Sequence, residues 1–273
     1  MTVNELLSYG NNYLAKDQTK LLLSYLLNVN LLELSLHLYD IVDSNLVNEY
    51  KNKVALISNG EPIQYVLSNT CFYGYDYHVN KNVLIPRFET EELVYETLSY
   101  LKKYFTKAKV LDLCTGSGCI GLTMKLELPS LDITLSDISK EALEVANINR
   151  NKYQLDSKII LSDLFQNINE KYDCIISNPP YISLDEEVMD IVKNNEPSIA
   201  LYADNNGLAI YERIFKEAFN YLNERSIMAF ELNSNKSQLI YNLARKYFPN
   251  AKIIIKKDNS QRDRMLFIFN NIE

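Results

Sequence analysis

The sequence predicts an α/β fold, a Rossmann-like doubly wound sheet of seven strands that follows a small helical bundle. Two observations support this prediction. After residue 109, seven short apolar runs recur with helix-like stretches between most of them. Such alternation predicts a mostly parallel sheet covered by helices on both faces. Before residue 71, leucines recur at intervals of three and four instead, which is typical of amphipathic helices.

Composition limits the class of protein. The 273 residues are 47% hydrophobic and 23% charged, which is typical of a folded chain with a core. The net charge of −7 disfavours nucleic acid as a direct partner. No C-x-x-C pair, signal peptide or membrane-length apolar run is evident, so we expect reduced thiols in a cytoplasmic protein away from membranes. Only two histidines occur, so we expect no metal site.

The chain is predicted to have three parts. Residues 1–70 form four or five short helices, which end at a Gly-Glu-Pro break at 60–62. Residues 71–87 become β-branched and aromatic around 80–82, which predicts a β-hairpin linker. Residues 88–273 form the α/β domain, beginning with a helix over 89–105. The strands are expected at 110–113, 132–136, 158–162, 173–177, 226–232, 251–256 and 265–269, with helices over 139–150, 207–222 and 236–247.

A glycine-rich loop follows the first of these strands. Gly116, Gly118 and Gly121 have the spacing G-x-G-x-x-G in a chain with only 7 glycines. Glycine lets the backbone turn sharply and approach a ligand closely. Asp137 ends the next strand, where a carboxylate is well placed for ribose hydroxyls. The pattern predicts an adenosine-containing ligand and fits a dinucleotide and S-adenosylmethionine equally, with a plain tight turn as the alternative.

Two further acidic residues bear on the choice of ligand. Asp112 lies just inside the glycine loop, where it suits an ammonium group and would repel a pyrophosphate. S-adenosylmethionine carries such an ammonium group, so it is the predicted cofactor; a loop-capping carboxylate is the alternative role. Asp163 follows the third strand and is a candidate for the adenine, with a helix N-cap as the alternative.

The fourth strand runs into the sequence Asn178-Pro179-Pro180-Tyr181. In a doubly wound sheet this end of a strand faces the ligand crevice. The two prolines lack backbone donors and stiffen the turn, so the Asn178 side chain and nearby carbonyls are held as acceptors. Two acceptors on a planar NH₂ group would orient its nitrogen for attack on an electrophilic methyl group, and Tyr181 could stack on it. A rigid surface turn is the alternative.

Together these motifs resemble class I S-adenosylmethionine-dependent methyltransferases that act on a planar NH₂ group. The Asn-Pro-Pro-Tyr motif alone is shared by DNA adenine, some rRNA and protein-glutamine methyltransferases. Four other stretches resemble the HemK/PrmC family of release factor glutamine methyltransferases, and the resemblance covers nearly the whole chain. They are GEPIQY at 60–65, VLIPRFETE at 83–91, NEPSIAL at 195–201, and the residues from Lys257-Asp258 to Arg262-Asp263-Arg264.

The resemblance implies N5-methylation of the glutamine in the Gly-Gly-Gln loop of peptide chain release factors 1 and 2, which modulates translation termination. S-adenosylhomocysteine would be the other product. The implied cofactor site comprises Cys114, Thr115, Gly116, Ser117, Gly118, Asp137, Asp163, Leu164 and Asn178, to which the charge argument adds Asp112. Asn178, Pro179, Pro180 and Tyr181 would bind the substrate glutamine and form the catalytic site.

The chain departs from the family pattern at four places. Cys114 stands where the family usually has glycine, and Leu164 where some members have tryptophan. Glu231 is followed by no glycine, and the glycine-rich turn before the fifth strand is replaced by residues 223–225. None of these departures falls within residues 178–181.

Several other functions are weighed against this one. A ribosomal-protein glutamine methyltransferase has the same Asn-Pro-Pro-Tyr motif, although residues 86–91 resemble the release-factor type. The acidic charge disfavours a DNA or rRNA methyltransferase. A nicotinamide-dependent oxidoreductase would leave residues 178–181 unexplained, and a silent binding module is disfavoured by the intact motif. Residues 1–70 contain no catalytic motif and are expected to recognise the protein substrate.

Overall fold

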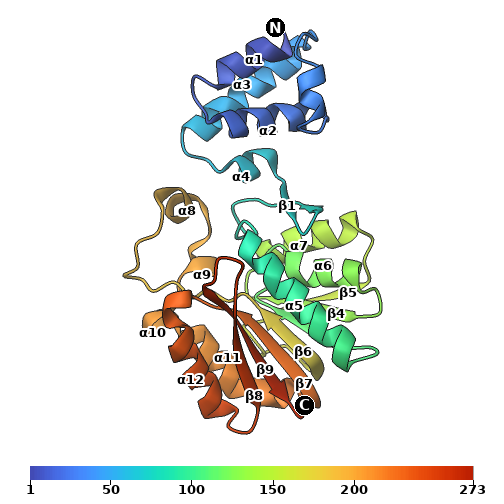
Figure 1. Ribbon diagram of the computed structural model, residues 1–273, viewed down its shortest axis with the longest axis vertical. Coiled ribbons are helices and arrows are strands. Elements are labelled where there is room, and N and C mark those ends of the chain that lie inside the picture. Colours follow the sequence, from blue (N-terminus) through green and yellow to red (C-terminus); the bar gives the residue numbers. More distant parts are fainter. Residues whose placement is uncertain (273) are drawn as a thin grey trace. The chain divides into compact units, whose positions relative to one another are not determined.

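The computed structural model describes residues 1–272 (Figure 1). The chain divides into two compact units. Unit 1 comprises Met1–Thr70 and Met189–Asn195, and unit 2 comprises Cys71–Val188 and the chain from Glu196 onward. No helix among the described residues is long and apolar enough to cross a membrane.

Unit 1 is helical, as the leucine spacing predicts. Its core includes Leu6, Leu22 and Leu23, which are fully buried together with Tyr50. The Tyr50 hydroxyl donates a hydrogen bond to the backbone oxygen of Leu6 at 3.1 Å, so the one polar atom of this large side chain is satisfied inside the core. The elements are α1 (Val3–Gly10), α2 (Lys16–Leu27), the 3₁₀ helix η1 (Glu33–Leu36), α3 (Ser44–Ser58) and α4 (Ile63–Leu67).

A short segment from the second half of the sequence also belongs to unit 1. It contains α8 (Asp190–Asn195), which lies far along the chain from the other helices of this unit. The Asn195 side-chain nitrogen donates to the backbone oxygen of Gly60 at 3.0 Å. Unit 1 therefore cannot be separated from the rest of the chain by one cut near residue 70.

The hairpin predicted between the two parts is confirmed, but its turn lies elsewhere. It consists of β1 (Thr70–Phe72) and β2 (Tyr75–Tyr77). The turn residues Tyr73 and Gly74 have φ values of 55° and 80°, as a tight two-residue hairpin turn requires. The asparagine-rich stretch at 80–82, around which the hairpin was predicted, forms no strand pair, because there the Asn80 side chain accepts from the nitrogen two residues later and makes a local turn.

Two aromatic residues of the hairpin anchor it in unit 2. Phe72 and Tyr77 are buried there. The Tyr77 hydroxyl lies 2.7 Å from the Thr123 hydroxyl on a helix of that unit. The hairpin is therefore part of the packed structure of unit 2.

Unit 2 is built on a seven-stranded sheet with the order β5-β4-β3-β6-β7-β9-β8, which confirms the predicted doubly wound architecture (Figure 1). The first five strands in this order are parallel, and β9 runs antiparallel to both β7 and β8. The bounds are β3 (Lys109–Leu113), β4 (Asp132–Asp137), β5 (Ser157–Leu161), β6 (Tyr172–Ser177), β7 (Leu222–Glu231), β8 (Lys252–Lys257) and β9 (Asp263–Asn270).

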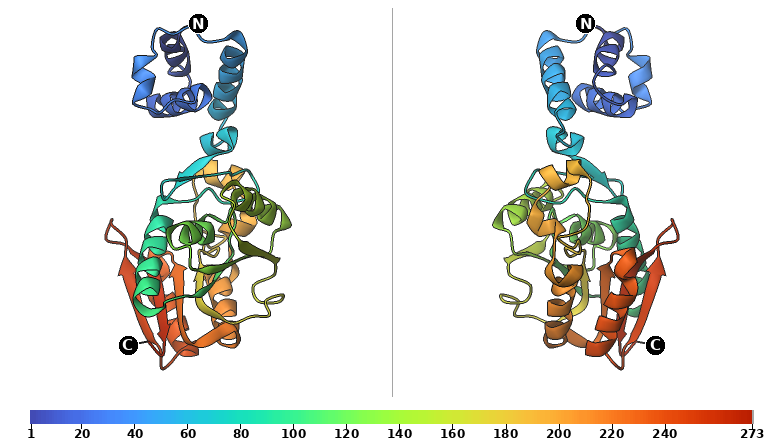
Figure 2. Two further views of the ribbon diagram at one scale, coloured as in Figure 1. Left: turned by 90° about the vertical axis from the view of Figure 1, so that its right-hand side faces the viewer. Right: turned by 90° about the vertical axis from the view of Figure 1, so that its left-hand side faces the viewer.

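Helices cover both faces of this sheet (Figures 1 and 2). One face packs against α5 (Phe88–Tyr104), α6 (Cys119–Glu127) and α7 (Lys140–Lys152). The other packs against α11 (Ala209–Ala218) and α12 (Ser237–Tyr247). The remaining short elements are α9 (Ser198–Leu201), α10 (Asp204–Gly207), η2 (Phe219–Tyr221) and η3 (Ser234–Lys236).

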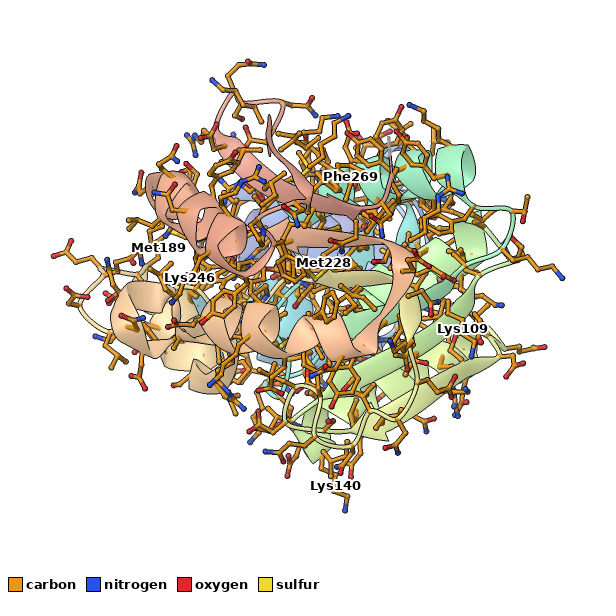
Figure 3. The ribbon with its side chains drawn as sticks, turned by 90° about the horizontal axis from the view of Figure 1, so that it is seen from below. Lys109, Lys140, Met189, Met228, Lys246 and Phe269 are labelled. Carbon is orange, nitrogen blue, oxygen red and sulfur yellow. The ribbon has the colours of Figure 1, made fainter. Side chains whose placement is uncertain are left out.

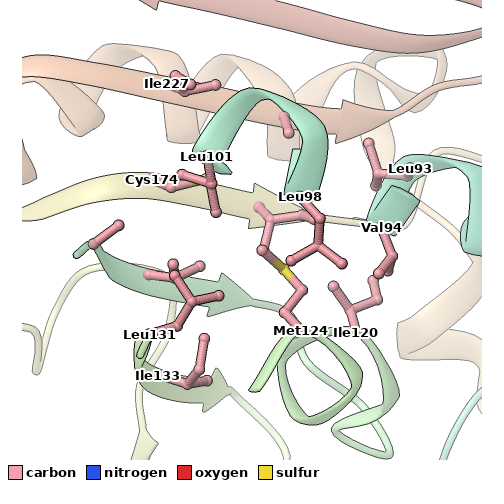
Figure 4. Close-up of a cluster of buried hydrophobic side chains, with 14 of the residues drawn as sticks. Leu93, Val94, Leu98, Leu101, Ile120, Met124, Leu131, Ile133, Cys174 and Ile227 are labelled. Carbon is pink, nitrogen blue, oxygen red and sulfur yellow. The ribbon is translucent and has the colours of Figure 1, made fainter. Parts of the chain in front are cut away.

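Alternate residues of the strands supply the two cores. Cys174 and Ile227 pack with α5 and α6, whereas Ile175 and Met228 pack with α11 and α12. Figure 4 shows the first cluster, in which Leu101 of α5 lies beside Cys174. Figure 3 shows Met228 inside the layers while Lys140 lies at the edge. Because the strands bury side chains on both faces, the sheet offers a ligand only the ends of its strands.

Candidate active site

A pocket lies where the carboxyl ends of β3, β4, β5 and β6 meet, within unit 2. Its open volume is about 1060 Å³, solvent at the mouth included. The chain reverses its direction of strand addition between β3 and β6, and ligands of doubly wound folds bind at such a point. Besides the strand ends, the lining includes residues of the stretch 82–90, Ile199 and Ala200 near α9, and Ile210 and Arg213 of α11.

The glycine loop forms one wall of this pocket. Gly116 has a φ of 55°, and a side chain added there would meet no atom within 4 Å, so this residue faces open space. A side chain at Gly121 would instead meet Leu135 at 2.5 Å, so this glycine is required for packing against the sheet. Cys114 also has a positive φ, 61°, which explains why a glycine suits this position and a cysteine is strained there.

Asp137 closes the base of the loop. One carboxylate oxygen accepts from the Gly116 backbone nitrogen at 2.8 Å and the other from the Ser139 nitrogen at 2.9 Å. Burial raises the pKa of this carboxyl, and the backbone hydrogen bonds oppose that rise. Each oxygen retains a lone pair for one more donor, so Asp137 can accept from two neighbouring hydroxyl groups in the pocket.

Asp112 lies beneath the loop and does not line the pocket. Its Oδ2 accepts from the Thr115 hydroxyl at 2.5 Å and from the Gly121 nitrogen at 2.9 Å, whereas Oδ1 is buried and has no hydrogen-bond partner among the described residues. Burial raises its pKa to about 7. Asp112 therefore connects two points of the loop from below.

Asp163 and Leu164 line the pocket just after β5, the strand farthest from β6 in this half of the sheet. Both carboxylate oxygens of Asp163 are 2.9 Å from one guanidinium nitrogen of Arg213 on α11. Leu164 is buried and has a φ of 50°, and its backbone oxygen accepts from the Ser162 hydroxyl. The apolar Leu164 and the carboxylate of Asp163 thus form adjacent parts of the wall.

The Asn-Pro-Pro-Tyr segment follows β6, which pairs with the strand that carries the glycine loop. Asn178 and Pro180 line it, and the Asn178 side-chain nitrogen is 3.3 Å from the Thr90 hydroxyl oxygen. The Tyr181 hydroxyl donates to the Glu231 carboxylate at 3.1 Å, and burial raises the pKa of this tyrosine. Tyr181 is thus fixed by its hydroxyl and does not line the pocket.

The structure brings nine of the thirteen predicted site residues to the pocket wall. These are Cys114, Thr115, Gly116, Ser117, Asp137, Asp163, Leu164, Asn178 and Pro180. Asp112, Gly118, Pro179 and Tyr181 do not line it. Within residues 1–272, no group of three His, Cys, Asp or Glu side chains is placed to bind a metal ion.

Most of the residues that line the pocket were not among the predicted site residues. Thr90 and Arg213 line the pocket, and Glu231 bonds to Thr90 at 2.5 Å. Arg87 also lines the pocket and forms an ion pair at 2.6 Å with Glu196, which is buried. The signal available for Glu231 was an acidic residue directly after the apolar run 227–230.

Comparison with known proteins assigns both units. The model of the PrmC N-terminal domain matches residues 5–67, and the model of the methyltransferase small domain matches residues 91–195. A release factor glutamine methyltransferase of Streptococcus pneumoniae is 40% identical over 210 residues, which cover 76% of this chain and 75% of that protein. One of Bacillus subtilis is 33% identical over 278 residues, which cover 97% of this chain and 96% of that protein.

Solved structures share the fold at low sequence identity. A methyltransferase from Pyrococcus furiosus aligns with a TM-score of 0.54 and 18% identity over 81% of this chain and 100% of that chain. A 16S rRNA N2 G1207 methyltransferase from T. thermophilus, solved with AdoMet and guanosine, aligns with a TM-score of 0.55 and 14% identity over 74% of this chain and 50% of that chain. Fold, pocket and family models together define a methyltransferase. The chain belongs to the release factor glutamine methyltransferase family, which confirms the resemblance drawn from its motifs.

Proposed function

We propose that this protein transfers the methyl group of S-adenosylmethionine to the side-chain amide nitrogen of a glutamine, and that its substrates are peptide chain release factors 1 and 2, methylated in their Gly-Gly-Gln loop. The observation that supports this most directly is the pocket, which is lined both by the glycine loop after β3 (the loop end) and by Asn178 after the neighbouring strand β6 (the acceptor end). Release factors act in translation, so the enzyme works in the cytoplasm and modulates termination.

The residues at the loop end fit S-adenosylmethionine. The open space at Gly116 admits a ligand against the backbone, and the two carboxylate oxygens of Asp137 can accept from the ribose hydroxyls. Asp163 and Leu164 can contact the adenine through its amino group and its face. Asp112 does not line the pocket, so its role is to position the loop and not to bind the ammonium group.

At the acceptor end, this chain's residues orient the substrate amide. The amide oxygen of Asn178 and a backbone carbonyl of the adjoining prolines accept the two hydrogens of the glutamine NH₂ group. Gripping both hydrogens aligns the nitrogen lone pair with the reacting carbon and lowers the entropic cost of the attack. When bound, S-adenosylmethionine supplies an electrophilic methyl group. The methylated nitrogen is strongly acidic and loses its proton to water or to the Asn178 oxygen.

A radiolabel assay tests the function. Purified protein and methyl-tritiated S-adenosylmethionine are incubated with four substrates in separate samples. These are an unmethylated release factor, the same factor carrying alanine for the glutamine of its Gly-Gly-Gln loop, an unmethylated ribosomal protein that other glutamine methyltransferases modify, and double-stranded DNA. We expect label in the first sample alone. Label in the ribosomal protein and not in the release factor would contradict the proposed substrate, and equal label in both release factors would contradict the proposed position.

We further propose that unit 1 docks the release factor. A short loop alone buries too little surface for a stable complex, so a second contact is needed. Unit 1 offers one, because four large apolar side chains there are more than three-quarters exposed: Leu32, Leu36, Tyr39 and Ile41. They follow one another within a single connection between α2 and α3.

The double change Leu32→Asp with Ile41→Asp tests this docking role. We expect a five- to tenfold higher KM for the release factor, with an unchanged Kd for S-adenosylmethionine, because charge would replace apolar contact. Phe219→Asp is the matched control, since it also places a charge at an exposed apolar residue but lies in unit 2. An unchanged KM would exclude these residues as the docking surface.

A further inference from the structure

One buried carboxylate supports the acceptor end of the pocket. Glu231 ends β7 and is 1% exposed. Its Oε2 accepts from the Thr90 hydroxyl of α5 at 2.5 Å, and its Oε1 accepts from the Tyr181 hydroxyl at 3.1 Å. Glu231 therefore bonds to two residues near Asn178. One is Thr90, whose hydroxyl oxygen lies 3.3 Å from the Asn178 side-chain nitrogen, and the other is Tyr181, the last residue of the Asn-Pro-Pro-Tyr segment.

Opposing influences act on the carboxyl of Glu231, and burial is the largest of them. Burial raises the pKa of this carboxyl, and Glu89 on α5 acts in the same direction, whereas the hydrogen bonds from Thr90 and Tyr181 and the guanidinium of Arg264 on β9 oppose the rise. Both oxygens of Glu231 act as acceptors, Oε2 for the Thr90 hydroxyl and Oε1 for the Tyr181 hydroxyl, so both hydroxyl groups point their protons at this carboxyl.

The bond to Glu231 determines whether the Thr90 hydroxyl donates to Asn178 or accepts from it. A threonine hydroxyl has one proton, and that proton is given to Glu231, so only the oxygen lone pairs remain. The group of Asn178 that lies 3.3 Å from this oxygen must therefore be the donor, which is the NH₂ group. The amide oxygen is then the end of the side chain left for the pocket.

We propose that Glu231 and Thr90 are positioning residues that set the orientation of the Asn178 amide, so that its oxygen and not its nitrogen meets the substrate NH₂ group. The inference rests on the proposed function, because only a donor substrate requires an acceptor there. With the amide turned over, two NH₂ groups would face each other and the substrate would lose one of its two orienting hydrogen bonds.

Reversing the direction of these hydrogen bonds tests the proposal. Asn178→Asp removes the donor, so the introduced carboxylate faces a hydroxyl whose proton is already given to Glu231. Glu231→Gln can supply an NH₂ group to Thr90, which frees the Thr90 proton for the carboxylate at position 178, while the introduced amide oxygen still accepts from Tyr181. We call the chain of hydrogen bonds from Asn178 through Thr90 to Glu231 the relay. It predicts that Glu231→Gln rescues Asn178→Asp.

The expected rates follow. Asn178→Asp should lower kcat at least a hundredfold, and Glu231→Gln alone no more than about tenfold, because its carbonyl can still accept from Thr90. The double variant should be at least tenfold faster than Asn178→Asp. Thr90→Ser should stay within threefold of the wild type and Thr90→Val should lose about tenfold in kcat, each with the cofactor Kd unchanged. A double variant no faster than Asn178→Asp would overturn the relay.

A second readout separates this inference from the proposed function. In a double-mutant cycle of unfolding in denaturant, the relay predicts that the double variant is more stable than the sum of the single changes implies. Additive unfolding free energies would overturn the relay whatever the substrate is. A wild-type protein that methylates no release factor would instead overturn the proposed function, and the unfolding cycle would still decide between relay and no relay.

Discussion

Two buried carboxyl groups, Asp112 and Glu231, support two parts of the same pocket, the glycine loop and the Asn178 side chain, and differ in how their charge is offset. Each accepts a hydrogen bond from a threonine hydroxyl at 2.5 Å. Both oxygens of Glu231 have partners, and the guanidinium of Arg264 opposes the rise of its pKa. Asp112 has one buried oxygen without a partner among residues 1–272, and the charge of Asp137 raises its pKa further.

The difference indicates what each end of the pocket requires. At the acceptor end, a carboxyl whose two oxygens both accept from hydroxyl groups sets the direction of those hydrogen bonds, which an oriented amide needs. At the loop end, the carboxyl only has to connect Thr115 and Gly121, and one accepting oxygen does this whether or not the group is charged. Burying a charged oxygen that has no hydrogen-bond partner costs free energy. The pKa of Asp112 is therefore raised to about 7, so the group stays protonated up to about neutral pH.

The largest effect is expected at the acceptor end. Asn178→Ala removes the amide oxygen that accepts from the substrate as charge develops, and one such hydrogen bond is worth about 2.7–4 kcal/mol. We expect kcat to fall a hundredfold to a thousandfold while calorimetry gives an unchanged Kd for S-adenosylmethionine. Asn250→Ala, at an exposed residue away from the pocket, should change neither value. Near wild-type turnover in Asn178→Ala would contradict a role of the Asn178 oxygen in orienting the substrate amide.

The next effect separates the two carboxyl groups by their response to pH. An acid whose pKa is raised on folding binds its proton more tightly in the folded state, so the stabilisation present at low pH is lost as pH rises through the folded pKa. For Asp112 that pKa is about 7. Between pH 5 and pH 8 the wild type should lose roughly 2–3 kcal/mol of unfolding free energy from this group.

Denaturant unfolding of Asp112→Asn measures that loss by difference. The variant keeps an accepting oxygen for Thr115 and Gly121 but has no proton to release, so its stability should fall less between pH 5 and pH 8. Asp137 also has a raised pKa, and it titrates in both proteins and cancels in the comparison. Parallel pH profiles for the two proteins would contradict a titrating Asp112.

The sequence predicted the sheet and the parts of the pocket wall that follow the strands directly, because those features are local. Each of the seven strands is an apolar run, and the glycine loop follows β3 directly. The surroundings of each loop glycine could not be predicted. Spacing alone does not show that Gly116 faces open space while Gly121 packs against Leu135. Asp112 was expected to meet the cofactor, yet the loop it supports lies between it and the pocket.

Long-range contacts could not be predicted in the same way. Thr90 and Glu231 are 141 residues apart, and only the folded sheet brings β7 beside the start of α5. The six residues of α8 are too few for their periodicity to show which core they join. The hairpin turn was placed at the asparagines because a tyrosine rarely adopts the positive φ that Tyr73 has.

At the loop end, Gly116→Val should weaken the cofactor and leave the acceptor end intact. A left-handed backbone costs a non-glycine residue about 1–2 kcal/mol, and the branched side chain would also occupy the open space of the pocket. We expect the Kd for S-adenosylmethionine to rise about thirtyfold. Gly74→Val is the matched control, because Gly74 also has a positive φ and open surroundings but does not line the pocket. Equal effects of the two changes would attribute the loss to folding.

The smallest effect concerns Asp163, the one carboxylate of the loop end that is held by a cation. Its partner Arg213 is 43% exposed and Asp163 is 29% exposed, so water and salt screen the pair. Exposed pairs of this kind contribute about 0.2–1 kcal/mol. Arg213→Gln should therefore raise the Kd for S-adenosylmethionine no more than about fivefold, and the difference from the wild type should shrink in 0.5 M salt, where the Debye length falls to about 4 Å. Lys246→Gln breaks the surface pair between Lys246 on α12 and Glu212 on α11 and should leave the Kd unchanged. A loss of affinity for S-adenosylmethionine well above tenfold that persists in high salt would mean that Arg213 contacts the cofactor itself. Cofactor binding at the loop end would then depend on a fixed charge, whereas we propose that substrate orientation at the acceptor end depends on the direction of hydrogen bonds.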